Sequence, residues 1–273
     1  MIALFYIPTV KTVEGDAMKV AVITGAAQGI GRRTAEVFAA AGYALALLDA
    51  RSCEATLAAV QAHEADAKEF RGDIADEGVV IRAAAGVSKR WGRVDVLVNN
   101  AGISFIAAAE SMQVEDFRRV LEVNLVAPFL LAKHFGGMML KQRAGSIVNV
   151  ASIAGLMGVS DRSAYNASKH GLIGLTRTLA AEWGGRGVRS NAVCPGWVKT
   201  EMDAADQARG TYSDADIEGR NPMGRFATPD DVARAIAFLA DPAQSGFING
   251  QSLAVDGGWT VDGSWESLRL GKR

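Results

Sequence analysis

Cysteine is scarce in this chain, whose 273 residues include two, Cys53 and Cys194. Two cysteines cannot build the disulfide framework of a small secreted protein, so we expect a reducing compartment and a cytoplasmic protein. Cys194 lies in an apolar run, which predicts an unreactive core side chain. Histidine is also scarce. His63, His134 and His170 are scattered without the spacing of metal ligands, so we predict no metal site.

Neither sign of charge is in excess. Lys and Arg together number 29 and Asp and Glu number 30, which gives a net charge of −1. This balance predicts no nucleic-acid partner and no anionic membrane surface. The longest uncharged apolar stretch, residues 37–48, contains Gly42 and is far shorter than the ~20 residues of a membrane span. The first ten residues lack a basic segment and a small-residue cleavage site, which argues against a signal peptide.

Short apolar runs alternate with helical segments along the chain. Strands are predicted near 19–24, 44–49, 68–72, 94–98, 145–150, 188–193 and 251–255, and long helices near 114–141 and 163–183. Apolar strands separated by helices are typical of a parallel sheet covered on both faces. We predict an α/β protein with one Rossmann-like domain, a doubly wound sheet of seven parallel strands with helices on both faces. It spans residues 18–260, between an N-terminal extension (1–17) and a C-terminal tail (261–273).

Several polar or glycine residues follow these strands directly. Gly25, Asn99, Ser152 and Pro195 each lie at or just after a predicted strand end. The carboxyl ends of parallel strands meet at one edge of a sheet, where ligands bind. The sequence therefore places these residues in one cleft.

Three glycines connect the first strand to the first helix in the segment Thr24-Gly25-Ala-Ala-Gln28-Gly29-Ile30-Gly31. Glycine permits tight backbone angles and close approach of a pyrophosphate. The helix that follows offers free N–H groups and the positive end of its dipole. This context predicts a dinucleotide site, and a glycine turn without a ligand is the alternative.

The second strand ends in a carboxylate, Asp49, 18 positions after Gly31. An acid here accepts hydrogen bonds from the adenosine ribose and repels a 2′-phosphate, which favours NAD over NADP. Gln28 is neutral and adds no phosphate affinity. Arg51 is the competing feature, since a guanidinium can pair with a 2′-phosphate.

Tyr165 and Lys169 are four residues apart in Tyr-Asn-Ala-Ser-Lys, so they share one face of a helix. A nearby ammonium favours the phenolate and lowers the tyrosine pKa. The pair can then exchange a proton with an alcohol oxygen near neutral pH.

From Lys19 to about Gly258 the chain resembles the short-chain dehydrogenase/reductase family. The resemblance rests on the T-G-x-x-x-G-I-G turn, on Asn99-Asn100-Ala101-Gly102, on the Tyr-x-x-x-Lys pair, and on Pro195-Gly196 with Thr200. It implies a catalytic tetrad of Asn124, Ser152, Tyr165 and Lys169. It also implies dinucleotide contacts by Gly25, Gln28, Gly29, Ile30, Gly31, Asp49, Asp73, Ile74, Asn100, Ala101, Gly102, Tyr165, Lys169, Pro195, Gly196, Val198 and Thr200.

The resemblance also implies roles within the tetrad. Tyr165 exchanges the proton, and Ser152 donates a hydrogen bond to the substrate oxygen. Lys169 lowers the Tyr165 pKa and holds the nicotinamide ribose. Asn124 anchors a water that links Lys169 to solvent. Without the resemblance, we would interpret Asn124 as a helix-breaking polar residue that satisfies backbone groups. The implied assembly is a homotetramer built on the two long helices.

Fewer residues are predicted to contact the substrate than the dinucleotide. We expect Ser104, Ile153, Arg162 and Trp197 to line its site, with Ala154, Val159 and Asp161 as further candidates. Arg162 suits a carboxylate, and a surface or subunit-contact role is its alternative. The polar, irregular segment 200–224 resembles the family's mobile lid, and a solvated excursion is its alternative.

We therefore predict an oxidoreductase that transfers a hydride between NAD(H) and a secondary alcohol or ketone of a sugar, polyol or sugar acid. NADP is the less favoured cofactor. A 3-oxoacyl-thioester reductase and a non-catalytic dinucleotide-binding regulator are the alternatives. The tail beyond Gly258 is rich in Trp and Leu but ends in basic residues, so we expect it along a subunit boundary.

Overall fold

A computed structural model describes residues 18–208, 212–265 and 268–269 of the chain. The expected N-terminal extension, 1–17, lies outside the described residues, as does the basic end of the tail, 270–273.

The centre of the protein is one sheet of seven strands. In chain order these are β1 (Val20–Thr24), β2 (Ala44–Asp49), β3 (Ala67–Arg71), β4 (Val96–Asn99), β5 (Gly145–Val150), β6 (Val188–Pro195) and β7 (Ser252–Val255). Their order across the sheet is β3-β2-β1-β4-β5-β6-β7, and every neighbouring pair is parallel. The predicted doubly wound parallel sheet is confirmed. Strand order reverses between β1 and β4, so the ligand-binding crevice is expected where these two strands end.

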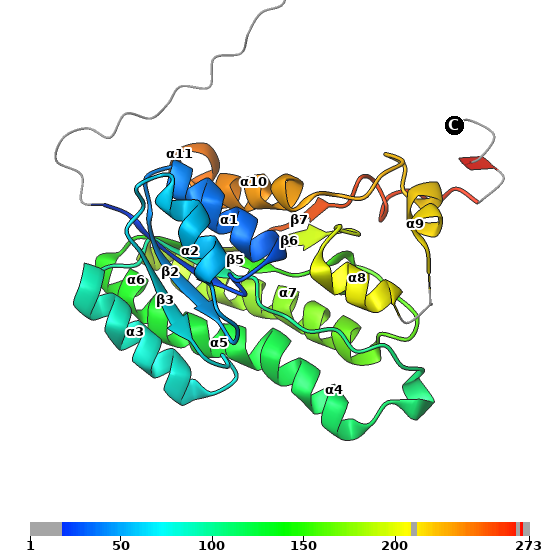
Figure 1. Cartoon of the computed structure of the whole chain (residues 1–273), viewed down its shortest axis with the longest axis horizontal. Helices are drawn as coiled ribbons and strands as arrows, with labels where there is room; N and C mark the ends of the chain where they lie inside the picture. Colours follow the sequence, from blue (N-terminus) through cyan, green and yellow to red (C-terminus); the bar gives the residue numbers. More distant parts are fainter. Residues whose placement is uncertain (1–17, 209–211, 266–267, 270–273) are drawn as a thin grey trace, which may run out of the picture.

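Helices cover both faces of the sheet (Figure 1). One face carries α1 (Gly29–Ala40), α2 (Glu54–Gln61) and α10 (Pro229–Ala240), with the short α11 (Pro242–Ser245) next to α10. The other carries α3 (Glu77–Trp91), α7 (Ser163–Trp183) and a continuous helical run comprising α4 (Val114–Leu121), α5 (Ala127–Leu131) and α6 (Gly137–Gln142). Both long helices predicted from the sequence are present.

The core consists of two apolar layers, one on each side of the sheet. Every residue of β1, β2 and β4 is buried. Alternate strand residues point to opposite faces. Ile23 and Leu47 pack with Phe38 and Ile236 on one side, and Val22 and its neighbours pack with α3, α5 and α7 on the other. Because helices cover both faces of the sheet, both sides of these strands are buried, and their sequences are therefore continuous apolar runs.

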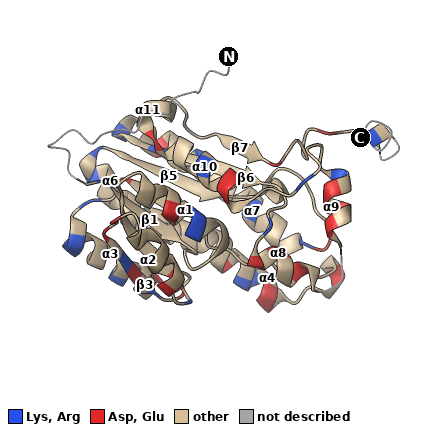
Figure 2. Cartoon of the chain, turned by 45° about the horizontal axis from the view of Figure 1, so that its top comes forward, with Lys and Arg blue, Asp and Glu red and all other residues tan. Residues whose placement is uncertain are grey.

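The helical run Val114–Gln142 is long enough to cross a membrane, with a mean hydropathy of 1.3 over its most apolar window. This differs from the sequence expectation, which considered uninterrupted apolar stretches alone. Half of that window is buried inside the protein, where Leu131, Phe135 and Met139 belong to the core. Core helices of soluble proteins have the same composition, so the run is explained by the fold. Over the face drawn in Figure 2, basic and acidic residues are interspersed.

Two short helices form most of segment 200–224: α8 (Glu201–Gln207) and α9 (Asp214–Arg220). The expectation of an irregular segment is therefore wrong. Both helices begin at a side chain suited to cap them: Thr200 accepts the Asp203 N–H at 3.4 Å, and Ser213 and Asp216 form a reciprocal capping box. Such caps satisfy N–H groups that a helix otherwise leaves unpaired.

Candidate active site

The glycine turn after β1 has the backbone geometry of a phosphate cradle. Gly25 and Gly29 have φ of 65° and 53°, backbone angles that residues with a side chain rarely adopt. A Cβ at Gly25 would lie 2.8 Å from the Ala101 Cα, and one at Gly31 would lie 2.0 Å from the Gly25 oxygen. The cap residue of α1, Gln28, makes no side-chain hydrogen bond to the helix, and no acid occupies the first turn. The N–H groups of this helix end therefore remain available to an anion.

The segment after β4 holds this turn in place. Thr24 Oγ1 accepts the N–H groups of Asn100 and Ala101, both at 3.0 Å. The Asn100 amide in turn donates to the carbonyls of Thr24 and Gly25 at 2.9 and 3.1 Å. These bonds join the ends of β1 and β4 across the strand-order reversal, so the crevice floor is rigid.

At the end of β2, Asp49 is buried and Arg51 is exposed. The Asp49 carboxylate accepts the Ala27 and Arg51 N–H groups, each at 2.9 Å. The Arg51 guanidinium lies 3.8 Å from Asp49 and donates to Gln28 Oε1 at 2.6 Å. Gln28 and Arg51 line the pocket, whereas Asp49 lies behind them. An acidic and a basic side chain therefore lie together at the end of β2, where the sequence predicts that the adenosine ribose binds.

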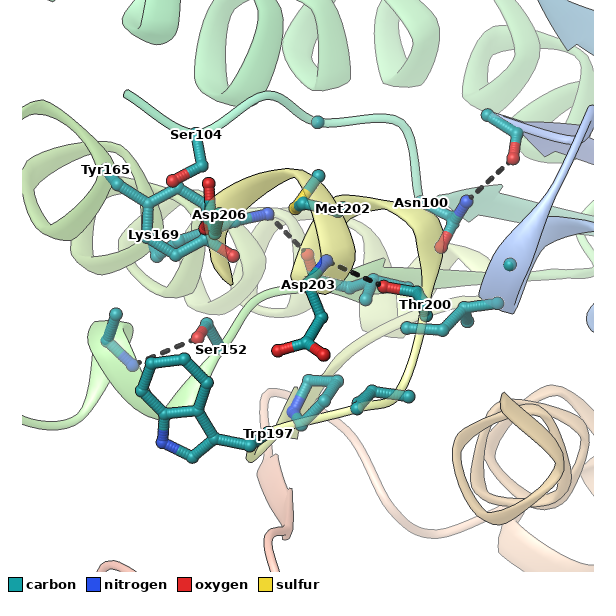
Figure 3. Close-up of a pocket in the computed structure, with 18 of the residues that line it drawn as sticks. Asn100, Ser104, Ser152, Tyr165, Lys169, Trp197, Thr200, Met202, Asp203 and Asp206 are labelled. Atoms are coloured by element: carbon teal, nitrogen blue, oxygen red, sulfur yellow. Dashed lines mark hydrogen bonds between the residues drawn. The ribbon is translucent and has the colours of Figure 1, made fainter. Parts of the chain in front are cut away.

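Ser152, Tyr165 and Lys169 converge on the same pocket from the end of β5 and the start of α7 (Figure 3). Ser152 Oγ accepts the Ala154 N–H at 3.1 Å and so begins a single turn, Ile153–Gly155. The Lys169 ammonium donates to the Val150 carbonyl at 2.8 Å and lies 5.4 Å from the centre of the Tyr165 ring. The residues predicted to form the catalytic centre are brought together.

Burial governs the protonation of this pair. It raises the pKa of Tyr165 above its usual value, while the Ser152 hydrogen bond and the Arg162 charge act in the opposite direction. It also lowers the pKa of Lys169 to about 8. The expected lowering of the Tyr165 pKa is therefore wrong for the protein without a ligand. Loss of water around the Tyr165 hydroxyl outweighs the groups that favour its phenolate.

Asn124 lies behind the pocket in a π-helical turn, Glu122–Val126, that interrupts the long helical run. Its amide oxygen accepts the Ile103 N–H and its amide nitrogen donates to the Ile103 carbonyl, both at 2.9 Å. A third bond, of 3.2 Å, reaches Ser168 Oγ on α7. Asn124 thus fastens the loop segment after Gly102 to α7, the helix that carries Lys169. Its predicted role in a water chain stays a prediction.

The end of the pocket beyond Tyr165 is polar and is closed by α8. Arg162 is buried within the single chain, so the surface position considered from the sequence is wrong. It donates to Ser104 Oγ at 2.7 Å and to Asp206 Oδ2 at 2.9 Å, and its guanidinium lies 5.5 Å from the Trp197 ring. Asp203, also on α8, accepts the Tyr212 hydroxyl at 2.9 Å.

Most of the predicted site residues line this one pocket. Those that do are Gly25, Gln28, Gly29, Ile30, Asn100, Ala101, Gly102, Ser104, Ser152, Ile153, Arg162, Tyr165, Lys169, Pro195, Gly196, Trp197, Val198 and Thr200, together with the further candidates Ala154 and Val159.

The remaining predicted residues lie elsewhere for identifiable reasons. Gly31 is packed under the turn, Ile74 is buried in the core and Asn124 is buried behind the pocket. Asp73 is about half exposed and pairs with Arg119. Asp161 is exposed in a left-handed turn.

The sequence prediction proposed a lid in segment 200–224 without naming its contact residues. Those that line the pocket are Glu201, Met202, Asp203, Asp206 and Tyr212, joined by Arg51, Val150 and Ala151. The capping signatures Thr200-x-x-Asp203 and Ser213-x-x-Asp216 were the sequence signal that pointed to helices here. Among the described residues, no group of three His, Cys, Asp or Glu side chains is arranged to hold a metal ion.

These features fit a dinucleotide. The glycine turn leaves no room for side chains and the α1 N-terminus is open to a pyrophosphate, while Tyr165 and Lys169 lie at the other end of the same crevice. A family model described as "Enoyl-(Acyl carrier protein) reductase" matches residues 25–260. The chain belongs to the short-chain dehydrogenase/reductase family and is an oxidoreductase that uses a nicotinamide dinucleotide.

Individual relatives span almost the whole chain. D-threitol dehydrogenase of Mycolicibacterium smegmatis is 42% identical over 247 residues, which is 89% of this chain and 93% of that protein. The 3-oxoacyl-[acyl-carrier-protein] reductase of Synechocystis sp. is 37% identical over 246 residues, 89% of this chain and 97% of that protein. A crystal structure assigned provisionally as an NAD(P) dependent gluconate 5-dehydrogenase from Beutenbergia cavernae, with bound NADP at low occupancy, has a TM-score of 0.84. It is 42% identical and covers 90% of this chain and 98% of its own.

Proposed function

We propose that this protein is a dehydrogenase that interconverts a secondary alcohol and a ketone on a polyol or sugar-like substrate, with Tyr165 as its acid–base residue. The observation that carries the proposal is the convergence of Ser152, Tyr165 and Lys169 in the pocket that also contains the glycine turn. The two free, buried cysteines suit a cytoplasmic location.

The residues of this chain divide the chemistry as follows. The dinucleotide, when bound, supplies the hydride acceptor for oxidation and the hydride donor for reduction. During oxidation the Tyr165 phenolate takes the hydroxyl proton while hydride leaves the same carbon. Ser152 donates to the substrate oxygen and orients it as the carbonyl forms. Lys169 holds the nicotinamide ribose and keeps a positive charge near the phenolate oxygen.

We also propose that NAD is preferred over NADP. Asp49 places a buried carboxylate at the end of β2. One guanidinium nitrogen of Arg51, Nη1, donates a hydrogen bond to Gln28 Oε1. Because Arg51 lines the pocket at the same place, NADP is used measurably but less well.

The reductase of 3-oxoacyl thioesters is the second candidate, since the Synechocystis relative carries that name. The polar substrate end, with Arg162, Asp203 and Asp206, suits a hydroxylated substrate better than an acyl chain. The retained Ser152, Tyr165 and Lys169 argue against a non-catalytic regulator.

The test is steady-state turnover with NAD and NADP on three substrate classes: tetritols and pentitols, their aldonates, and a 3-oxoacyl thioester in the reductive direction. We expect oxidation of polyhydroxy substrates. Tyr165→Phe keeps the ring and should lower turnover at least ~10²-fold, the smaller effect expected for a lost general acid–base group. Dinucleotide binding, measured by fluorescence titration, should persist. Activity confined to the thioester would contradict the proposal.

A further inference from the structure

The lid helix α8 places two carboxylates in the substrate end of the pocket. Asp203 and Asp206 are 6% and 8% exposed, so both are held away from bulk water. Both line the pocket, Asp206 beside Ser104 and Tyr165 and Asp203 on the side of Trp197 (Figure 3). Carboxylates in such a place accept hydrogen bonds from hydroxyl groups and oppose the entry of another anion.

The positive charge at this end is already neutralised. Arg162 Nη1 makes both of its described hydrogen bonds within the protein, to Ser104 and to Asp206, and its guanidinium lies beside the Trp197 ring. A substrate carboxylate would need to displace Asp206 to reach Arg162. Lys199 is about half exposed and lies 3.5 Å from Asp203 and against Asp214, outside the pocket lining. Lys169 does line the pocket, but its ammonium donates to the Val150 carbonyl at 2.8 Å.

Two polar atoms of the pocket-lining residues lack a hydrogen-bond partner among the described residues. One is an acceptor, Asp203 Oδ2, whose contact with the Lys199 ammonium at 3.5 Å is an ion pair, and the other is a donor, Trp197 Nε1. Buried polar atoms are costly to leave unpaired, so a ligand that pairs them gains affinity. A substrate hydroxyl group can donate to the Asp203 carboxylate, whereas a substrate carboxylate can only accept hydrogen bonds.

From these contacts we infer that Asp203 and Asp206 make the enzyme select uncharged polyols over the aldonates of the same chain length. This inference rests on the proposed function and narrows its substrate class. In it, Asp206 is a specificity residue because its ion pair with Arg162, at 2.9 Å, removes the positive charge that would hold a substrate anion, and Asp203 adds a second buried carboxylate that opposes one.

The test compares matched substrates, D-threitol with D-threonate and xylitol with xylonate, by kcat/KM with saturating NAD. The wild-type enzyme should favour the polyol of each pair at least ~10-fold, a small part of the effect of like charges placed in contact. Asp206→Asn removes the carboxylate that neutralises Arg162 and leaves the guanidinium charge available to a substrate carboxylate. It should lower the KM for the aldonate and reduce the polyol-to-aldonate ratio at least ~10-fold. Asp203→Asn is a second variant, with a smaller shift in the same direction.

Glu182→Gln is the matched control. It removes one negative charge from an exposed position near the far end of α7, about 25 Å from Tyr165 at 1.5 Å per residue, and should leave the ratio unchanged. A wild-type enzyme that favours aldonates, or an Asp206→Asn ratio equal to that of wild type, would overturn the inference while leaving the proposed function intact. Failure to oxidise either class, with dinucleotide binding intact, would overturn both.

Discussion

At the scale of single residues, the proposed preference for NAD depends on opposed charges at the end of β2. The Asp49 carboxylate and the Arg51 guanidinium are 3.8 Å apart, so each partly offsets the other. An acid here competes for the ribose hydroxyls, and a guanidinium attracts a 2′-phosphate. The preference therefore depends on a difference between two interactions, each of about 1.5–3 kcal/mol for hydrogen bonds to a charged group.

The two possible substitutions should move this preference in opposite directions. Asp49→Ala should lower kcat/KM for NAD roughly 10-fold and shift the preference toward NADP, since it removes both the ribose acceptor and the repelling charge. Arg51→Ala should shift the preference toward NAD. The measurement is the ratio of kcat/KM values for NAD and NADP with one polyol. A wild-type preference for NADP would show that Arg51 outweighs Asp49.

The raised pKa of Tyr165 also has a residue-scale consequence. Alcohol oxidation requires the phenolate and ketone reduction requires the phenol. Because burial raises the Tyr165 pKa above its usual value, the phenolate is scarce at neutral pH in the free enzyme. We expect kcat/KM for oxidation to rise from pH 7 toward pH 10, and kcat/KM for reduction to fall over the same range.

Two variants identify the group responsible for that profile. Ser152 lowers the Tyr165 pKa and Asp206 raises it. Ser152→Ala should therefore move the oxidation profile to higher pH, and Asp206→Asn should move it to lower pH. The readout is the midpoint of kcat/KM against pH, which is independent of the loss in rate. Shifts of the same sign in both variants would assign the profile to a different group.

At the scale of elements, regular patterns were predictable and tertiary effects were not. All seven strands and the long helices were predicted, because continuous apolar runs and helical periodicity depend on local sequence. The π-helical turn at Asn124 was not predicted, since it accompanies the bonds of that side chain to Ile103 and Ser168, 21 residues before it and 44 after it.

The same distinction holds within the candidate site. The glycine turn and the Tyr165–Lys169 pair were predicted, because each is a short motif whose local geometry determines its chemistry. The lid was predicted in segment 200–224, but the helix α8 and its contact residues were not, since a short polar helix has no apolar periodicity to show which side faces the pocket. Its placement depends on the ion pair between Arg162 and Asp206, which joins α7 to the lid.

At the scale of the whole molecule, the long helical run leaves apolar side chains uncovered. Val114, Val126 and Phe129 are 54%, 36% and 49% exposed. They lie on the helices expected to pair in a homotetramer, and an apolar helix face of this kind marks an interface. We expect wild-type protein to sediment as a tetramer. Phe129→Asp should give a smaller species, because a charge in an apolar interface loses hydration without a partner.

The tail is the second apolar surface, and its first part is bound to the chain's own lid. Arg220 on α9 donates to the carbonyls of Trp259 and Asp262, and Trp259 lies beside Trp197. Beyond this anchor Val261 and Trp265 are 84% and 68% exposed. Because α9 follows the pocket-closing helix α8, a tail covered by a neighbouring subunit would couple assembly to the substrate end of the site.

Truncation after Gly263 tests this coupling. It keeps the Trp259 and Asp262 contacts to Arg220 but removes Trp265 and the Arg269 bond to Asp262. We expect a weaker tetramer by sedimentation velocity and a higher substrate KM, with the KM for NAD unchanged because the glycine turn is remote from the tail. Trp265→Ala in the full chain is the companion variant and should give a smaller change of the same kind. An unchanged tetramer with an unchanged substrate KM would show that the tail is a passive surface strip.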